Sequence, residues 1–229
     1  MTPDTIIVIQ ARLGSTRLPG KVLAPMDRVP LLVHCIRRLL SAGAGPVVVA
    51  TSDLARDAPV AGTAAQAGAR VVRGDEADVL GRFARAIEDW SGPFVIRATG
   101  DNPAVDPGSV TRVRAALAGG ADYAVERGLP LGATVEGVRA DRLRRAAAEA
   151  VSPRDREHVT PFIRARPDRF LVVELDAPPE LARPDLRFTV DTPDDFAYMR
   201  ALLEDLGAGS RIVPLAEIIA RATRPRPDA

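Results

Sequence analysis

Cysteine, lysine, histidine and long apolar runs are scarce or missing in this chain of 229 residues. The single cysteine, Cys35, excludes an intramolecular disulfide and a zinc site built from several cysteines, and its apolar helical surroundings predict a buried packing residue. No apolar stretch approaches the roughly 20 residues that cross a bilayer. The opening Met1-Thr2-Pro3-Asp4 lacks the basic residues of a signal peptide. We therefore expect a cytoplasmic protein with no membrane partner.

Net charge is also almost absent, because 31 basic and 30 acidic residues leave a formal charge of +1. A general nucleic-acid binder carries a net basic field, so no nucleic acid partner is expected. The hydrophobic content of 46% can bury a large core, and no stretch is long enough to be a linker between two domains. The chain is predicted to be one domain, residues 1–229.

The only lysine, Lys21, ends a loop rich in glycine and arginine that begins at Gln10 and follows the apolar run Ile6 to Ile9. Lysine is a compact point charge and arginine a planar fork, so a lysine retained among so many arginines indicates a place where the fork does not fit. The loop also offers close backbone approach, hydroxyl donors and further cations, at Gly14 and Gly20, Ser15 and Thr16, and Arg12 and Arg17. It predicts a polyphosphate site, and the alternative is a solvated surface loop.

Two familiar phosphate-binding motifs do not match this loop. A Walker A motif has four residues between its glycines and Ser or Thr after its lysine, whereas five residues separate Gly14 from Gly20 and Val22 follows Lys21. The chain also has no G-x-G-x-x-G dinucleotide fingerprint. Neither motif therefore accounts for the loop, and both the polyphosphate site and the solvated surface loop stay open at this point.

Short β-branched runs alternate with stretches of helical spacing in the first half of the chain, which indicates βαβ units and a parallel sheet covered on both faces. The expected strands are Ile6 to Gln10, Pro46 to Thr51, Arg70 to Arg73 and Pro93 to Ala98. The expected helices are Pro30 to Ala42, Ala55 to Ala67, Ala77 to Trp90 and Pro107 to Ala118. The fold class is α/β.

The rhythm changes after Ala121, which predicts a mixed sheet with an inserted subregion. The expected strands are Tyr123 to Glu126, Thr134 to Val138, Phe170 to Leu175 and Arg187 to Val190. The expected helices are Asp141 to Ala150, Arg154 to Arg166, Pro193 to Leu206 and Pro214 to Ala222, followed by a frayed tail from Arg224.

Two aspartates follow expected strands. Asp101 lies in Gly100-Asp101-Asn102-Pro103, where it suits a metal site that is completed by substrate phosphates, or else an Asx turn; Asn102 suits either. Asp191 precedes Thr192-Pro193, where Thr192 or Asp191 is suited to cap a helix. Because parallel strands end at one rim of a sheet, we expect Asp101 and Asp191 to meet there.

These segments together resemble the cytidylyltransferases that act on acylneuraminate and 3-deoxy-manno-octulosonate, and most closely the branch of the spore coat polysaccharide biosynthesis protein F. The resemblance spans nearly the whole chain and keeps one order. It includes Gln10-Ala11-Arg12 through Gly20-Lys21, Val49-Ala50-Thr51-Ser52-Asp53, Arg73-Gly74-Asp75, Asp78-Val79-Leu80-Gly81-Arg82, Arg97 through Pro103, Arg156-Glu157-His158-Val159-Thr160-Pro161, and Thr189 through Phe196.

The resemblance implies a single-domain nucleotide-diphospho-sugar transferase fold, Rossmann-like, with a mixed, mostly parallel sheet. It implies transfer of CMP from CTP to a small acidic acceptor with release of pyrophosphate, and Mg²⁺ as cofactor. The implied catalytic residues are Arg12, Lys21 and Asp101, and the implied metal ligands are Asp101 and Asp191. The implied nucleotide-binding residues are Gln10, Ala11, Arg12, Gly14, Ser15, Arg17, Lys21, Thr51, Asp78, Val79 and Leu80. The implied acceptor-binding residues are Asn102, Glu136, Arg156 and His158, and residues 123–170 are expected to form an acceptor and homodimer subregion.

One segment departs from the branch, which usually has arginine and aspartate where this chain has Leu131 and Thr134. The change alters the acceptor side, and Glu136 remains there either as a ligand or as an exposed strand residue. His158 is either an acceptor or subunit contact or a structural histidine. The departure keeps two alternatives open, which are a glycosyltransferase that uses a nucleotide-sugar and a non-catalytic nucleotide-binding scaffold.

Overall fold

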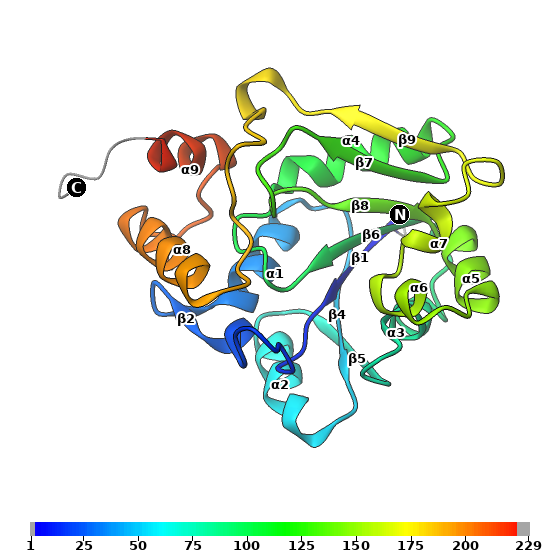
Figure 1. The fold of residues 1–229 in the computed structure, drawn as a ribbon, viewed down its shortest axis with the longest axis horizontal. Coiled ribbons are helices and arrows are strands. Elements are labelled where there is room, and N and C mark those ends of the chain that lie inside the picture. Colours follow the sequence, from blue (N-terminus) through cyan, green and yellow to red (C-terminus); the bar gives the residue numbers. More distant parts are fainter. Residues whose placement is uncertain (1–2, 224–229) are drawn as a thin grey trace.

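A seven-stranded sheet forms the centre of the computed structural model, which describes residues 3–223 (Figure 1). The strand order is β5-β4-β1-β6-β8-β7-β9. The strands are β1 Thr5–Gln10, β4 Val47–Ser52, β5 Arg70–Gly74, β6 Phe94–Thr99, β7 Tyr123–Arg127, β8 Glu136–Arg139 and β9 Val172–Asp176. All pairings are parallel except those of β8, which is antiparallel to β6 and β7. The predicted mixed, mostly parallel sheet is confirmed.

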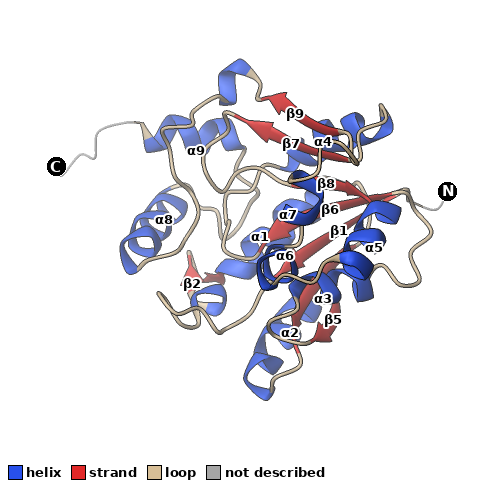
Figure 2. Cartoon of the chain, turned by 45° about the vertical axis from the view of Figure 1, so that its right-hand side comes forward, coloured by secondary structure: helices blue, strands red, loops and turns tan. Residues whose placement is uncertain are grey.

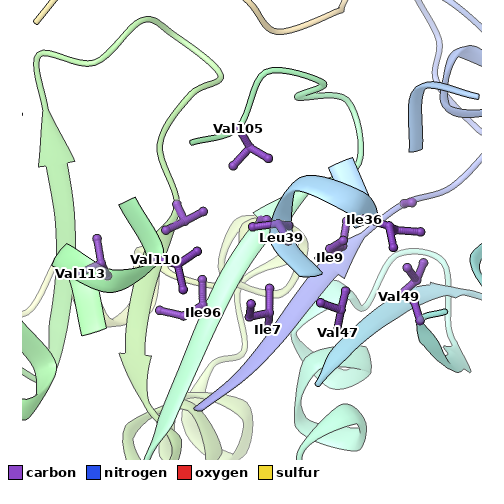
Figure 3. Close-up of a cluster of buried hydrophobic side chains, with 14 of the residues drawn as sticks. Ile7, Ile9, Ile36, Leu39, Val47, Val49, Ile96, Val105, Val110 and Val113 are labelled. Carbon is purple, nitrogen blue, oxygen red and sulfur yellow. The ribbon is translucent and has the colours of Figure 1, made fainter. Parts of the chain in front are cut away.

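Helices cover both faces of this sheet (Figure 2). One face packs against α1 (Leu31–Ser41), α2 (Ala58–Gln66) and α4 (Pro107–Ala118), and the other against α3 (Val79–Ala86), α5 (Ala140–Glu149) and α7 (Pro161–Arg164). Successive side chains of a strand point to opposite faces. Ile7 and Ile9 accordingly lie in the first core, seen in Figure 3, and Ile6 and Val8 in the second. This explains why β1 is a continuous apolar run.

A third apolar cluster lies beyond the sheet, where α8 (Pro193–Asp205) and α9 (Leu215–Ala222) pack near the hairpin β2 (Pro25–Met26) and β3 (Val29–Pro30). In Figure 1 this end lies opposite α5 and α7. Cys35 is fully buried in this cluster, and burial raises the pKa of its thiol, so the predicted packing role is confirmed. The shorter helices are η1 Lys21–Leu23, η2 Ala55–Asp57, α6 Pro153–His158 and η3 Pro179–Leu181. Within residues 3–223, no helix has the length and apolar character of a membrane span.

Two sequence predictions in the second half of the chain are wrong. The expected helix from Arg154 to Arg166 is split, because Val159 has a left-handed φ of 71° and Pro161 cannot continue a helix from the residues before it. The expected strand from Arg187 to Val190 is only an isolated bridge between Leu131 and Arg187. The hairpin of β2 and β3 was not predicted, and the expected tail from Arg224 lies outside the described residues.

Candidate active site

A cavity of about 400 Å³ opens at the carboxyl ends of β1 and β6. This is the rim where ligands bind in α/β sheets. The residues predicted for the site that line it are Gln10, Ala11, Arg12, Gly14, Ser15, Arg17, Lys21, Val79, Asp101, His158 and Asp191. Segments that are far apart in the chain therefore come together in one cavity.

Lys21 joins the two predicted metal-ligand aspartates. Its Nζ donates to Asp101 Oδ2 at 2.8 Å, to Asp191 Oδ1 at 3.2 Å and to the carbonyl of Val190 at 2.6 Å. An ammonium has three N–H donors, so all three are used. The side chain is only 8% exposed, and three acceptors converge on one atom, which a planar guanidinium cannot reproduce. The retained lysine thus has a geometric cause.

Two arginines lie beside the Asp191 carboxylate in addition to Lys21. Arg17 lies 3.0 Å from its Oδ1 and Arg187 donates to its Oδ2 at 2.6 Å. Burial alone would raise the pKa of the Asp191 carboxyl, but hydrogen bonds and charges from Lys21, Arg17 and Arg187 hold that pKa below its ordinary value. Asp191 therefore stays ionised at neutral pH. Thr192, next in the chain, caps α8 in a capping box with Asp195, so the alternative in which Thr192 is the cap is confirmed.

The loop from Gln10 to Lys21 is anchored by Asp57, a residue that the sequence analysis did not identify. Its carboxylate is fully buried, accepts the N–H of Leu13 at 2.7 Å and also accepts the hydroxyl of Ser52. At the other end of the loop, Gly20 has a left-handed φ of 76° and its N–H donates to the Leu13 carbonyl at 3.2 Å. The backbone of Leu13 is thus held from both sides, through its N–H by Asp57 and through its carbonyl by Gly20. No sequence motif indicates the contact between Leu13 and Asp57.

Arg82 is a second missed residue. It is buried, and its Nη1 donates to the carbonyls of Asp75 at 2.6 Å and Glu76 at 2.9 Å. Arg12 Nη1 donates to the same Glu76 carbonyl at 2.9 Å. Burial, and then the charge of Arg12, lower the pKa of Arg82. The only sequence signal was the position of Arg82 after Asp78-Val79-Leu80-Gly81.

Several predicted residues lie outside this cavity. Asp78 caps α3 and pairs with Arg156, and both line a neighbouring cavity of about 860 Å³ that shares Arg12, Gly14 and Glu157 with the first. Thr51 and Leu80 are fully buried. Asn102 does not line either cavity, and its Oδ1 is buried without a hydrogen-bond partner among the described residues. His158 is exposed at the edge of the first cavity.

Glu136 is buried, which excludes the alternative of an exposed strand residue. Its carboxylate accepts from Arg97, from the Tyr123 hydroxyl at 2.5 Å and from the Thr160 hydroxyl at 3.0 Å. Burial would raise the pKa of Glu136, but the charge of Arg97 and these hydrogen bonds keep it below its ordinary value. Glu136 is therefore an internal anion held by protein groups, and it does not line the cavity.

The chain is similar to known proteins along nearly its whole length. Residues 6–213 match the cytidylyltransferase family model. Spore coat polysaccharide biosynthesis protein SpsF of Bacillus subtilis is 37% identical over 233 residues, which cover 99% of this chain and 96% of that protein.

Two solved structures share the fold. A cytidylyltransferase from Leptospira borgpetersenii has a TM-score of 0.84 at 24% identity and covers 95% of this chain and 93% of its own. CMP:2-keto-3-deoxy-manno-octonic acid synthetase, complexed with CTP, has a TM-score of 0.65 at 19% identity and covers 88% of this chain and 99% of its own. The family match and the full-length relative together identify the chain as a nucleotidyltransferase of the cytidylyltransferase family.

Proposed function

We propose that this protein is a Mg²⁺-dependent cytidylyltransferase that transfers CMP from CTP to an acidic sugar in surface polysaccharide or natural-product biosynthesis. The observation that carries the proposal is the meeting of Lys21, Asp101 and Asp191 in a cavity that Arg12 and Arg17 also line. A solved structure of the same fold holds CTP, and that protein is a sugar-acid synthetase, which supports both the nucleotide and the class of acceptor.

In this reaction an oxygen of the acceptor attacks the α-phosphorus of CTP. The bond between that phosphorus and the bridging oxygen to the β-phosphate breaks, and pyrophosphate leaves. Such transfer depends on positioning and on neutralising charge. Arg12, Arg17 and Lys21 supply the cations, and the loop fixed at Leu13 positions them.

The residues present fit a magnesium ion. Among residues 3–223 no group of three or more acidic, histidine or cysteine side chains could hold a metal by itself. Mg²⁺ commonly binds through one or two carboxylates and substrate phosphates, and Asp101 and Asp191 both reach one cation, the Nζ of Lys21. These two aspartates would hold Mg²⁺ together with the nucleotide, and the ion would neutralise phosphate charge.

Thermal unfolding with each of CTP, UTP, GTP and ATP, in Mg²⁺ and in EDTA, tests the nucleotide half of the proposal. A ligand at 100 times its dissociation constant adds about 2.7 kcal/mol of stability. A shift of melting temperature with CTP that requires Mg²⁺ supports the proposal, and no shift with any triphosphate contradicts it.

Pyrophosphate release from CTP with 3-deoxy-manno-octulosonate, N-acetylneuraminate and related sugar acids tests the reaction. CTP binding without release, including with a crude extract of the source organism, would favour the scaffold. Consumption of a nucleotide-sugar in place of CTP would favour the glycosyltransferase. We also expect the protein to be cytoplasmic. We expect it to form a homodimer through residues 123–170, and light scattering and crosslinking test this expectation.

A further inference from the structure

The orientation of the Gln10 side chain is fixed by Arg97. Arg97 donates to Gln10 Oε1 from Nε at 3.2 Å and from Nη2 at 3.0 Å. A guanidinium has only donors, so the atom of the carboxamide that faces it must be the oxygen. The amide nitrogen of Gln10, which has two N–H donors, is therefore turned away from Arg97.

Arg97 is in turn fixed by Glu136. These residues lie opposite each other in the pairing of β6 and β8, and Arg97 Nη1 donates to Glu136 Oε2. The Glu136 carboxylate is itself held by Tyr123 and Thr160. A chain of charge-assisted hydrogen bonds thus runs from the buried centre of the sheet to the side chain of Gln10, and such bonds are the stronger and more directional kind.

The free end of this chain is in the cavity. Gln10 lines the cavity, and no residue in the range 3–223 accepts a hydrogen bond from its Nε2. A fixed donor without a protein partner is available for a ligand. By contrast, Arg12 reaches the carbonyl of Glu76, which follows β5 on the opposite side of β1 from β6. Gln10 and Arg12 therefore reach toward opposite sides of β1.

We propose that Gln10 is a specificity-determining residue whose Nε2 donates to a carboxylate oxygen of the acceptor, and that Arg97 and Glu136 are the positioning residues that set its orientation. This inference rests on the proposed function, since it assigns the acceptor to the β6 side and the triphosphate to the cationic loop. It replaces the nucleotide-binding role that the family resemblance implies for Gln10. Glu136 then contributes to acceptor recognition through Arg97 and Gln10, without contacting the acceptor.

Gln10→Glu is the sharpest test, because it keeps an oxygen for Arg97 and replaces only the donor by a second oxygen. A carboxylate ligand is then repelled, whereas a hydroxyl ligand can donate to the new oxygen and stay bound. We expect Gln10→Glu and Gln10→Ala each to raise the KM for the sugar acid at least tenfold. We expect the Kd of Mg²⁺-CTP, measured by calorimetry without acceptor, to change less than threefold. Gln66→Glu makes the same change at the only other glutamine, exposed in α2, and should alter neither constant.

The positioning role is tested by Arg97→Lys, alone and combined with Gln10→Ala. If Arg97 acts through Gln10, the single substitution raises the acceptor KM and adds nothing in the Gln10→Ala background. If the effects of the two substitutions on the acceptor KM are additive, the positioning role is overturned. A fall in melting temperature and in kcat with unchanged KM would likewise indicate a structural role.

Each remaining outcome decides between the inference and the proposed function. A larger change in the Kd of Mg²⁺-CTP than in the acceptor KM places Gln10 on the nucleotide and overturns its assignment. Loss in Gln10→Ala but not in Gln10→Glu indicates a hydroxyl ligand and overturns the carboxylate. If the wild-type protein releases no pyrophosphate with any sugar acid, the proposed function is overturned, and so is the assignment of a sugar acid as the ligand of Gln10. The Kd of Mg²⁺-CTP for the Gln10 variants would still show whether Gln10 contacts the nucleotide.

Discussion

Arg12 and Arg82 donate to the same oxygen, the carbonyl of Glu76, each at a distance of 2.9 Å. Two like charges are thus held together beside a cavity by one neutral acceptor. Burial, together with the charge of Arg12, destabilises the cationic form of Arg82, and a polyanion bound in the cavity would offset the repulsion between the two guanidinium groups. The pair of guanidinium groups supports the proposal that a triphosphate binds in this cavity.

Arg82→Met should weaken CTP binding by removing one of these two cations and the support that it gives to the Glu76 carbonyl. We expect the Kd of Mg²⁺-CTP to rise about tenfold, which corresponds to about 1.4 kcal/mol. Calorimetry measures it. Arg85→Met removes an exposed guanidinium of the same helix and should leave the Kd unchanged. Equal effects of the two substitutions would contradict a specific role for Arg82.

Lys21→Met and Lys21→Arg should both lower kcat/KM for CTP at least 100-fold, about 2.7 kcal/mol of transition-state stabilisation. Methionine leaves Asp101 and Asp191 without their shared cation, and arginine cannot bring one nitrogen to three acceptors. Pyrophosphate release under steady-state conditions measures the loss. Arg28→Met removes a cation that is 94% exposed and is the control. An active Lys21→Arg variant would show that charge alone suffices at this position.

Asp57→Ala should destabilise the fold by about 1–3 kcal/mol, because it leaves the N–H of Leu13 and the buried Ser52 hydroxyl without their acceptor. It should also weaken CTP binding, since the loop loses its anchor. Urea unfolding and calorimetry measure the two effects. Asp89→Ala, at an exposed aspartate with no side-chain hydrogen bond to residues 3–223, should stay within about 0.5 kcal/mol of wild type. An Asp57→Ala protein with the stability and the CTP affinity of the wild type would contradict the anchoring role.

The sequence predicts those parts of the molecule in which local pattern and tertiary structure agree. The run Ile6 to Ile9 predicts a buried parallel strand because all four of its side chains are apolar, and they do lie in the cores on the two faces of the sheet. The strand expected at Arg187 to Val190 does not form because Phe188 and Thr189 both donate to the Leu131 carbonyl and Val190 donates to the Asp101 carbonyl, which is not the pattern of a strand ladder. No local sequence pattern reveals these partners. The hairpin of β2 and β3 has two residues in each strand, too few to show alternation.

The candidate site divides in the same way. The loop from Gln10 to Lys21 and Asp101 carry their chemistry in short motifs, so the sequence indicates them. The groups that hold the loop do not, because their partners are distant: Leu13 and Asp57 are 44 residues apart, and Gln10 and Arg97 are 87 apart. Positioning residues are visible only when the fold brings both partners together.

Asp195 should make stability depend on pH in acid. Burial would raise the pKa of its carboxyl, but hydrogen bonds from Arg187 and from the N–H groups of Asp191 and Thr192 lower that pKa to about 2. A depressed carboxyl pKa contributes stability that is present above the unfolded-state pKa of about 4 and is lost as pH falls toward about 2. Urea unfolding between these pH values should show a smaller acid loss in Asp195→Asn than in wild type. Asp194→Asn, at the exposed neighbour, should retain the wild-type slope, and a slope unchanged in Asp195→Asn would contradict the assignment.

Gly100→Ala should strain the contact between the turn that follows β6 and carries Asp101 and the end of β1. An added Cβ would lie 2.8 Å from the Cβ of Ala11 and 3.1 Å from the Gln10 carbonyl, and neither of these atoms can rotate away. Overpacking of this kind costs about 1–3 kcal/mol, and relief by backbone movement would shift Asp101 from Lys21. We therefore expect lower stability in urea and a higher Kd for Mg²⁺-CTP. Gly62→Ala is the matched control, because its Cβ meets nothing within 4 Å in α2 and should stabilise the protein by about 0.5–1 kcal/mol. A Gly100→Ala protein as stable as Gly62→Ala would show that the rim of the sheet is more plastic than its packing indicates.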